Sequence, residues 1–378
     1  MPVRATKRGA ERTSFAPGAS ADVLICGASF AGLAVARELR AAGAEVLVLD
    51  RYEIGERQTS ACAAPTRWLL NLGLEGSIRQ TFGSLLVHTP RRTARWSLPW
   101  TFSTFDYRTL CRLLWEQCEA EFETAKVDGR TGNLVHTDRG DVSAPLIVDA
   151  LGWRRVLGSG ANVQPPDAPL SRGLEVHPDG RGEDLELWLE PRYVSPGYGW
   201  SFPARDELRI GVGSFDPEIH VKQPTLALAS DVEADAVRFQ GNWIPHRLRP
   251  ATEDGVFFAG DSAGHCLPLT AEGIRTALYF GIACGRELRA VLDGRQKPSQ
   301  ALRRYHDFSA GHAWRFACMY GAQQSVRRLH GRPMDALVRL FGRRAVSHWA
   351  FGHYLEIAPP EFAFPAPAAQ SPPLAAAA

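Results

Sequence analysis

The chain has 378 residues, 45% of them hydrophobic, which is enough for two or three domains with a large buried core. Its formal net charge of +2 excludes a general nucleic-acid binder, whose basic stripe would raise the charge much further. The 7 Cys residues lack zinc-ligand spacing and no apolar run is long enough to span a membrane, so we expect no metal and a cytoplasmic protein.

The first predicted unit is a β–α–β segment, which follows a polar lead at residues 1–20 that we expect to be disordered. Short continuous apolar runs at 23–26 and 46–49 are typical of strands buried on both faces of a parallel sheet. Residues 31–42 predict the helix between them, and Gly43 ends it because glycine readily adopts the left-handed conformation found at helix C-termini.

Further along the chain the pattern changes from buried strands to alternating ones. Helical spacing of apolar residues predicts a helix at 106–123, with Asp106 as its N-cap. Apolar runs at 146–150 and 256–259 predict two more buried strands. Between them, residues 170–215 alternate in polarity, which predicts antiparallel strands of a second domain.

The C-terminal third is predicted to be mainly helical. A helix is expected at 272–292, and residues 300–356 are helical in pattern and rich in Arg and aromatic residues. The Pro/Ala-rich tail at 359–378 is expected to be disordered.

The strongest local signal is the run Gly-Ala-Ser-Phe-Ala-Gly at residues 27–32, between the first strand and the first helix. The terminal glycines allow a tight turn and close helix–strand packing, and the helix N-terminus supplies N–H donors for a pyrophosphate. Ser29 stands where a second glycine is usual and adds a hydroxyl near the phosphate. Asp50 ends the next strand, where a carboxylate can bind ribose hydroxyls. These features predict a dinucleotide site, and a ligand-free glycine turn is the weaker alternative.

A second run, Gly-Asp-Ser-Ala-Gly at 260–264, follows the strand at 256–259 and precedes a helix that begins near Gly273. Together the two runs resemble the FAD signatures of glutathione-reductase-type and aromatic-hydroxylase-type flavoproteins. The resemblance covers roughly residues 21–300. It implies that Asp261 binds the ribityl chain and that the helix N-terminus faces the pyrimidine side of the flavin, where its dipole stabilises negative charge.

The segment at 146–152 matches the middle strand of such flavoproteins. Leu151 stands where hydroxylases usually carry Asp, which moves the resemblance away from the hydroxylases. The sequence has no second Gly-rich β–α–β unit, so a dedicated NAD(P)H domain is not implied. We therefore expect electrons from NAD(P)H or another external donor, and an electron-donor protein is one alternative.

An aromatic run, Pro-Gly-Tyr-Gly-Trp-Ser-Phe-Pro at 196–203, is followed by Gly-Val-Gly at 211–213. It resembles the YxWxFP…GxG motif of the geranylgeranyl reductase family, whose members saturate isoprenoid double bonds with reduced FAD. The resemblance implies that Tyr198 and Trp200 wall the substrate cavity beside the flavin, because rigid aromatic rings present apolar area at low entropic cost. A hydrophobic strand in a sheet core is the alternative.

Other resemblances are more local. Some geranylgeranyl reductases place a Cys near the flavin in a comparable segment, which makes Cys62 a candidate catalytic residue, with a buried structural thiol as the alternative. Arg108 opens the 106–123 helix, where related flavoproteins often hold the cofactor with Arg. Flavin-dependent halogenases carry a related aromatic motif but need a Lys that this chain lacks, since none occurs between Lys7 and Lys126.

We therefore predict an α/β fold with a doubly wound Rossmann-type FAD-binding domain, a mixed β-sheet substrate domain and C-terminal helices. The FAD-binding domain is expected at 21–80, 104–160 and 250–298, the substrate domain at 81–103 and 161–249, and the helical region at 299–358. The expected cofactor-binding residues are Gly27, Ser29, Phe30, Ala31, Gly32, Asp50, Arg51, Arg108, Gly260, Asp261, Gly273 and Ile274, and the expected catalytic residues are Tyr198, Trp200 and Cys62.

The predicted reaction is hydride transfer from reduced FAD to a carbon–carbon double bond of an isoprenoid or a similar apolar small molecule. A proton donor is needed as well, and the sequence does not identify it. One alternative is a flavin monooxygenase acting on an aromatic or polyketide-like substrate, and another is a non-catalytic flavin- or lipid-binding module. The C-terminal helices either close the substrate cavity or make a peripheral membrane contact.

Overall fold

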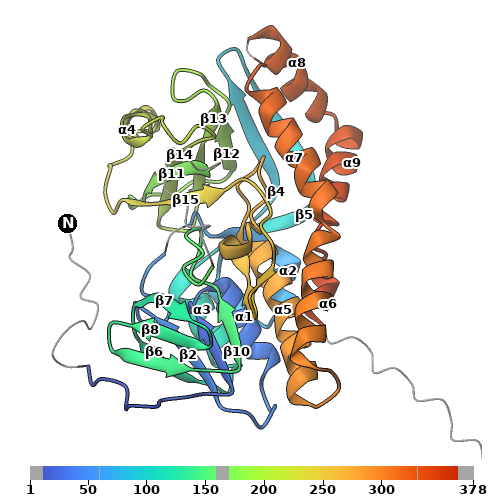
Figure 1. Ribbon diagram of the computed structural model, residues 1–378. Coiled ribbons are helices and arrows are strands. Elements are labelled where there is room, and N and C mark those ends of the chain that lie inside the picture. The colour runs from blue at the N-terminus through green and yellow to red at the C-terminus, as the bar shows by residue number, and fades with distance from the viewer. Residues whose placement is uncertain (1–11, 59, 159–169, 330, 365–378) are drawn as a thin grey trace, which may run out of the picture.

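The computed structural model describes residues 12–364, apart from residue 59, residues 159–169 and residue 330. They form two large β-sheets with helices packed beside both (Figure 1). Parts of the expected lead and tail lie outside the described residues, but the parts inside them are ordered. Phe15 packs under the guanidinium of Arg139, and Ala363 is buried at the end of a short 3-10 helix, η3 (Pro360–Ala363). The apolar side chains of these two stretches pack against the core.

The first sheet has six strands in the order β16-β17-β10-β1-β2-β6. All neighbouring strands are parallel except β16, which pairs antiparallel with β17 at one edge. The central strand β1 is buried along its whole length, as its continuous apolar run predicts. The strands are β1 (Val23–Cys26), β2 (Val46–Asp50), β6 (Glu121–Thr124), β10 (Leu146–Asp149), β16 (Thr252–Glu253) and β17 (Val256–Phe258).

Helices α1 (Phe30–Glu38) and α5 (Ile274–Leu292) pack closely together beside this sheet. A Cβ on Gly281 would lie 2.7 Å from the carbonyl oxygen of Ala31, so glycine is what allows the two backbones to approach. A small sheet of β7 (Val127–Thr131), β8 (Leu134–Thr137) and β9 (Gly140–Ser143) adds apolar residues to the same core.

Two predicted helices are shorter than expected. Helix α1 ends at Glu38, and Gly43, with φ of 66°, lies in the turn that leads to β2. Helix α3 (Tyr107–Trp115) ends early because the last residues of the predicted helix form β6, which pairs with β2 instead. Asp106 is its N-cap as predicted, because its carboxylate accepts the N–H of Thr109 at 2.7 Å.

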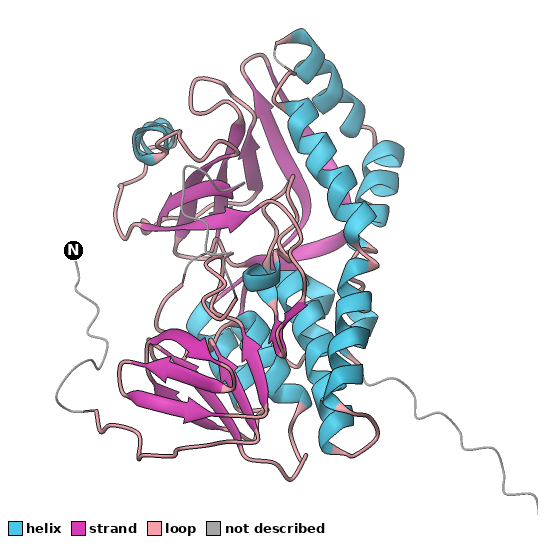
Figure 2. Cartoon of the chain, in the orientation of Figure 1, coloured by secondary structure: helices cyan, strands magenta, loops and turns pink. Residues whose placement is uncertain are grey.

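The second sheet has eight strands in the order β15-β11-β14-β13-β12-β4-β5-β3 and lies beside the first (Figure 2). Its neighbours are antiparallel except for β12 and β4, so the alternating pattern correctly predicted antiparallel strands. Helix α4 (Lys222–Asp231) packs against β11 and β14. The strands are β3 (Ala63–Pro65), β4 (Ile78–Thr89), β5 (Arg92–Phe105), β11 (Leu170–Val176), β12 (Leu185–Trp188), β13 (Gly197–Pro203), β14 (Leu208–Ser214) and β15 (Gln240–Pro245).

The C-terminal region is helical, as predicted, but it is divided into four helices. They are α6 (Pro298–Ala310), α7 (Ala313–Val326), α8 (Arg332–Phe341) and α9 (Arg344–Leu355). Figure 1 shows that they follow the long β4–β5 hairpin and the end of α5. None of the helices in the described ranges is both long enough and apolar enough to cross a membrane.

Candidate active site

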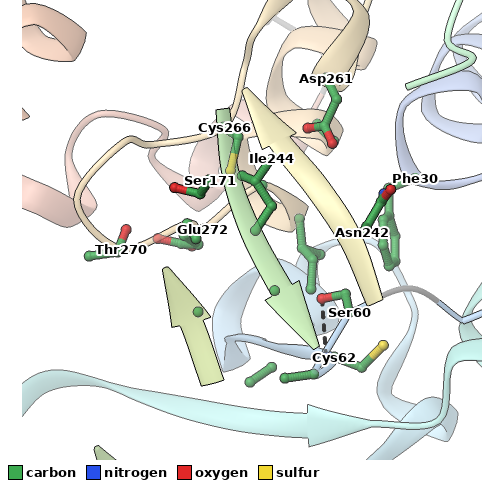
Figure 3. A pocket seen from close by; sticks show the side chains of 18 of the residues that line it. Phe30, Ser60, Cys62, Ser171, Asn242, Ile244, Asp261, Cys266, Thr270 and Glu272 are labelled. Atoms are coloured by element: carbon green, nitrogen blue, oxygen red, sulfur yellow. Dashed lines mark hydrogen bonds between the residues drawn. The ribbon is translucent and has the colours of Figure 1, made fainter. Parts of the chain in front are cut away.

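A cavity of 1020 Å³ lies between the two sheets and the C-terminal helices. Its walls come from the start of α1, the end of β2, strands β11, β13 and β15, the loop before α5, and helices α7 to α9. Figure 3 shows side chains that reach it from these separate parts of the chain, among them Phe30, Ser171 and Asp261. A single chamber therefore joins all three sequence motifs.

The glycine turn after β1 has no room for side chains. Gly27 has φ of 113°, and a Cβ there would lie 2.3 Å from the carbonyl oxygen of Ala150. A Cβ on Gly32 would lie 1.8 Å from the carbonyl oxygen of Gly27. Neither glycine lines the cavity; they instead let β1, α1 and β10 meet, and this brings Ser29, Phe30 and Ala31 to the cavity wall.

The N-terminus of α1 opens into the cavity without a side-chain cap. The hydroxyl of Ser29 lies 3.0 Å from the hydroxyl of Tyr107 and is turned away from the first helical N–H groups. The expected hydroxyl near a phosphate is therefore engaged by Tyr107, and the free N–H groups of the first turn remain available to an anion.

Asp50 stands at the same end of the cavity. One carboxylate oxygen accepts the N–H of Ala28 at 2.8 Å and the other accepts the N–H of Tyr52 at 2.9 Å. Burial raises the pKa of Asp50, while these N–H groups and the charge of Arg51 oppose the rise. Asp50 and Arg51 both line the cavity, where the sequence places the ribose-binding end.

Arg108, which the sequence analysis expects to hold the cofactor, does not line the cavity. Its side chain is exposed, and its backbone packs on Gly55, because the orientation of α3 turns Tyr107 rather than Arg108 inward. Three other cations line the cavity: Arg57, Lys126 and Arg154. Lys126 follows β6, next to β2, so the rule that ligands bind at the carboxyl ends of parallel strands could have identified it.

The second signature lies opposite the first. Gly260 has φ of 65° at the start of η2 (Gly260–Ala263), and Asp261 faces the cavity. Within the described part of the chain, no protein group donates a hydrogen bond to the Asp261 carboxylate. Burial raises the pKa of Asp261 to about 6, and the nearby Arg249 partly opposes this. The oxygens of this buried carboxylate therefore need hydrogen-bond donors, and the hydroxyl groups of a ligand would supply them.

Helix α5 presents its N-terminus to the cavity a few residues later. Gly273 is its N-cap, has no side chain to cap the helix, and lines the cavity together with Ile274. The positive end of the helix dipole therefore points at the chamber. Two uncapped helix N-termini and an unpaired carboxylate fit the pyrophosphate, the flavin ring and the ribityl hydroxyls of FAD.

The aromatic motif forms one wall. Tyr198, Trp200 and Phe202 alternate along β13 and all line the cavity. The rings of Tyr198 and Trp200 are 6.0 Å apart, and the Tyr198 hydroxyl donates to the carbonyl oxygen of Thr270 at 2.6 Å. The Trp200 N–H donates to Glu175 Oε2 at 3.2 Å. The expected orientation of the aromatic residues toward a cavity is therefore present, and the tryptophan holds an acidic residue beside it.

Another part of the cavity lining comes from the C-terminal helices, for which the sequence analysis left two roles open. Met334, Leu337 and Phe341 of α8, with Phe351 and Tyr354 of α9, line the cavity. The helices therefore close the chamber, and the apolar face of α8 is the sequence signal that could have shown it.

Hydrogen bonds connect the C-terminal end of α9 to α5. The fully buried Arg275 binds Glu272 through two hydrogen bonds, of 2.7 and 2.9 Å, and donates to the carbonyl oxygen of Leu355 at 2.7 Å. Trp68 of α2 (Thr66–Asn71) donates to the carbonyl oxygen of Ala358 at 3.0 Å. These hydrogen bonds connect α2 and α5 to the residues at and just after the end of α9, which are far away in the sequence.

Comparison with known proteins separates the alternatives. No family model matches the chain. It is 24% identical over 328 residues to digeranylgeranylglycerophospholipid reductase 3 of Methanosphaera stadtmanae, which is 77% of this chain and 83% of the relative. A digeranylgeranylglycerophospholipid reductase of Methanopyrus kandleri is also 24% identical, over 76% of this chain and 81% of the relative.

The chain is similar in sequence to digeranylgeranylglycerophospholipid reductases over about three quarters of its length.

Solved structures agree with this assignment in fold. A geranylgeranyl bacteriochlorophyll reductase-like protein from Thermoplasma acidophilum superposes with a TM-score of 0.78 at 17% identity, over 91% of this chain and 98% of that one. PqsL, a probable FAD-dependent monooxygenase from Pseudomonas aeruginosa, gives a TM-score of 0.59 at 17% identity, over 89% of this chain and all of its own. Like these sequence relatives, the protein is an FAD-dependent oxidoreductase.

Cys62, the third candidate catalytic residue, also lines the chamber. It has φ of 52°, and its N–H donates to the Ser60 hydroxyl at 3.3 Å (Figure 3). Burial raises the pKa of the thiol well above its ordinary value, and the same holds for Cys266, another thiol in the wall. Both thiols are therefore neutral and unsuited to act as nucleophiles near neutral pH.

Proposed function

We propose that this oxidoreductase reduces carbon–carbon double bonds of an isoprenoid or a similar apolar substrate. The observation that carries the proposal is the chamber itself. Tyr198, Trp200 and Phe202 line a cavity together with the apolar side chains of α8 and α9, and the same cavity receives both FAD signatures. A large, mostly apolar pocket suits a prenyl chain, whereas a phenolic substrate would need more polar orienting groups. The names of the archaeal relatives support the same substrate class.

In this proposal, the protein holds the cofactor with residues at one end of the chamber. The N-terminus of α1, from Ser29 to Ala31, binds the pyrophosphate, and Asp50 and Arg51 bind the adenosine half. Asp261 binds the ribityl chain, and Gly273 and Ile274 present the α5 N-terminus to the flavin ring. Bound FAD, once reduced, supplies the hydride that a double bond accepts. The electron donor that reduces it is proposed to be NAD(P)H or a donor protein.

The remaining residues act on the substrate. Trp200 and Tyr198 hold the prenyl chain beside the cofactor, and the helices α8 and α9 exclude water from the chamber. Cys62 lines the chamber, and its thiol is neutral. It therefore contributes to the shape of the chamber and adds no charge to it.

We also propose a peripheral contact with anionic lipid through the C-terminal helices. Trp314 of α7 and Trp349 of α9 are each 67% exposed. On the outer side of α8, a hollow of 560 Å³ is lined by Arg92, Arg332, Arg339 and Arg343 together with Asp335. Exposed tryptophans and arginines favour a membrane surface, from which a lipid substrate would be taken.

The test of the function is single-turnover mass spectrometry. FAD-loaded protein is reduced anaerobically and mixed with geranylgeranyl diphosphate or a digeranylgeranylglycerol phospholipid. A product heavier by two hydrogen atoms per bond is expected. A product carrying an added oxygen atom after exposure to air would support the monooxygenase alternative, whose fold PqsL shares. Stable flavin binding with no product from either lipid would favour the binding-module alternative.

A further inference from the structure

A chain of titratable residues runs from the chamber toward the surface of the second sheet. Glu175 lines the cavity, and its carboxylate lies 2.8 Å from Nε2 of His177. Both side chains are nearly fully buried, at 4% and 3% exposure. On the other side of the ring, Nδ1 of His177 is 3.4 Å from Glu207, whose side chain is 30% exposed. The path therefore has one end in the chamber and the other at solvent.

Neighbouring groups of opposite charge along this path stabilise one another's ionised forms. Arg209 donates to Glu207 at 2.9 Å and keeps it ionised: burial would raise the pKa of Glu207, but the hydrogen bonds from His177 and Arg209 lower it to about 2. Burial would lower the pKa of His177, but its bonds to Glu175 and Glu207 outweigh this and raise it. His177 is thus a cation between two carboxylates.

Gln240 of β15 is consistent with a protonated ring. Its amide nitrogen lies 3.4 Å from Nδ1 of His177, while its Oε1 is buried without a hydrogen-bond partner among the described residues. An imidazolium carries a proton on both nitrogens, so exchanging the two amide atoms would let Oε1 accept the proton of Nδ1. Protonation of His177 at Nδ1 would thereby give Oε1 of Gln240 a hydrogen bond.

Other acidic groups in the chamber are less suited to give up a proton. Glu272 is held by Arg275 through two hydrogen bonds and also accepts from Tyr354. Burial raises the pKa of Tyr198 far above its ordinary value, and its hydroxyl is bonded to Thr270. The thiol of Cys62 also has a raised pKa. Asp50 and Asp261 belong to the cofactor end.

We propose that Glu175 delivers the proton for double-bond reduction as a relay: it takes the Nε2 proton of the His177 imidazolium and passes it to the substrate, with Trp200 positioning its carboxylate. The inference rests on the proposed function. One alkene carbon gains the hydride of the reduced flavin and the other gains the proton of Glu175, so the substrate gains two hydrogens and the flavin is oxidised. His177, left neutral once its Nε2 proton has reached the substrate through Glu175, then regains a proton from solvent at Nδ1, beside Glu207, which is a role that the two ring nitrogens allow.

The first test needs neither cofactor turnover nor substrate. In protein with isotope-labelled histidines, NMR titration gives the pKa of His177, assigned by its loss in H177N. We expect E175Q to lower this pKa, because the neutral amide no longer stabilises the imidazolium. E186Q is the matched control, since Glu186 binds His88 at 2.7 Å in the same sheet but does not line the cavity. An unchanged His177 pKa in E175Q would overturn the relay.

The second test measures proton delivery. Reduced, FAD-loaded protein is mixed anaerobically with geranylgeranyl diphosphate, and flavin reoxidation is followed in H₂O and D₂O. E175Q should be slower by about a hundredfold with unchanged FAD affinity, and H177N should be slowed and should shift the pH profile. E186Q should match the wild type. Wild-type rate and isotope effect in E175Q would refute Glu175 as the donor. If the wild-type protein reduces no isoprenoid, the proposed function fails, and the His177 titration alone decides whether the relay exists.

Discussion

The indole of Trp200 occupies the space that a side chain at position 211 would need: a Cβ on Gly211 would lie 2.2 Å from Cζ2 of the ring. The two residues face each other across paired strands β13 and β14. On the same strands, Tyr198 pairs with Gly213, where a Cβ would lie 3.4 Å from Cζ3 of Trp200. The aromatic run and the Gly-x-Gly run therefore form one structural unit, in which the two glycines leave space for the indole of Trp200.

This pairing predicts that G211A impairs the chamber while leaving the cofactor site intact. The added methyl group must push Trp200 out of position and disturb its bond to Glu175. We expect turnover to fall at least about tenfold with unchanged FAD affinity, because overpacking costs roughly 1–3 kcal/mol. Steady-state assays and flavin titration measure both. The control is G129A, since Gly129 has open space around it. Equal turnover in G211A and G129A would contradict the prediction.

A second prediction concerns the glycine turn. G32A places a methyl group against the carbonyl of Gly27, and G27A is strained by its φ of 113° as well as by contact with Ala150. Both variants should purify with little or no flavin, because the α1 N-terminus shifts away from the pyrophosphate. Absorbance of the bound flavin measures this, and circular dichroism confirms the fold. G321A is the control, on the open surface of α7. Full flavin content in both variants would contradict the assignment of this turn as the pyrophosphate-binding site.

Replacing Asp261 is predicted to raise the stability of the FAD-free protein and to weaken FAD binding. Its folded pKa of about 6 exceeds the unfolded value of about 3.9, so the folded state binds more protons and FAD-free protein loses stability as pH rises between those values. D261N should therefore be more stable than the wild type above about pH 6, by up to roughly 3 kcal/mol, with the difference vanishing near pH 4.

The same D261N variant should bind FAD about ten- to a hundredfold more weakly, because a hydrogen bond to a charged group contributes roughly 1.5–3 kcal/mol. Denaturant unfolding at two pH values and flavin titration give the two numbers. D254N is the control, since Asp254 lies outside the cavity lining. A destabilised D261N with normal FAD affinity would assign Asp261 a purely structural role.

The outer face of the C-terminal helices yields a test of the lipid contact. The double variant W314A/W349A should bind anionic phospholipid vesicles about tenfold more weakly, because inserting a large aromatic side chain contributes roughly 1.5–3 kcal/mol. Flotation assays measure the change, and added salt should weaken binding further. F239A is the control, because Phe239 is 45% exposed beside β15 rather than on these helices. Identical flotation of the double variant and the wild type would argue against a membrane contact.

The motifs were predictable because each is local. Glycines at 27–32, Asp261 before a helix and the alternation of Tyr198 with Trp200 are fixed by neighbours in sequence. That Arg108 lies outside the cavity lining could not be foreseen, because the rotation of α3 about its axis is decided by packing and not by the motif. Glu175 was missed for a similar reason: alternation along β11 does not show which face meets the chamber until the sheet is paired.

The attachment of Arg275 to Leu355 and of Trp68 to Ala358 has a consequence for how the protein is made. The ribosome must extend the chain past Ala358 before the last wall of the chamber can dock. Until then the rings of β13 face water in the nascent chain. A message cut short within α9 would therefore yield a polypeptide with both nucleotide signatures but with a chamber open on one side, which is a substrate for chaperones rather than a partial enzyme.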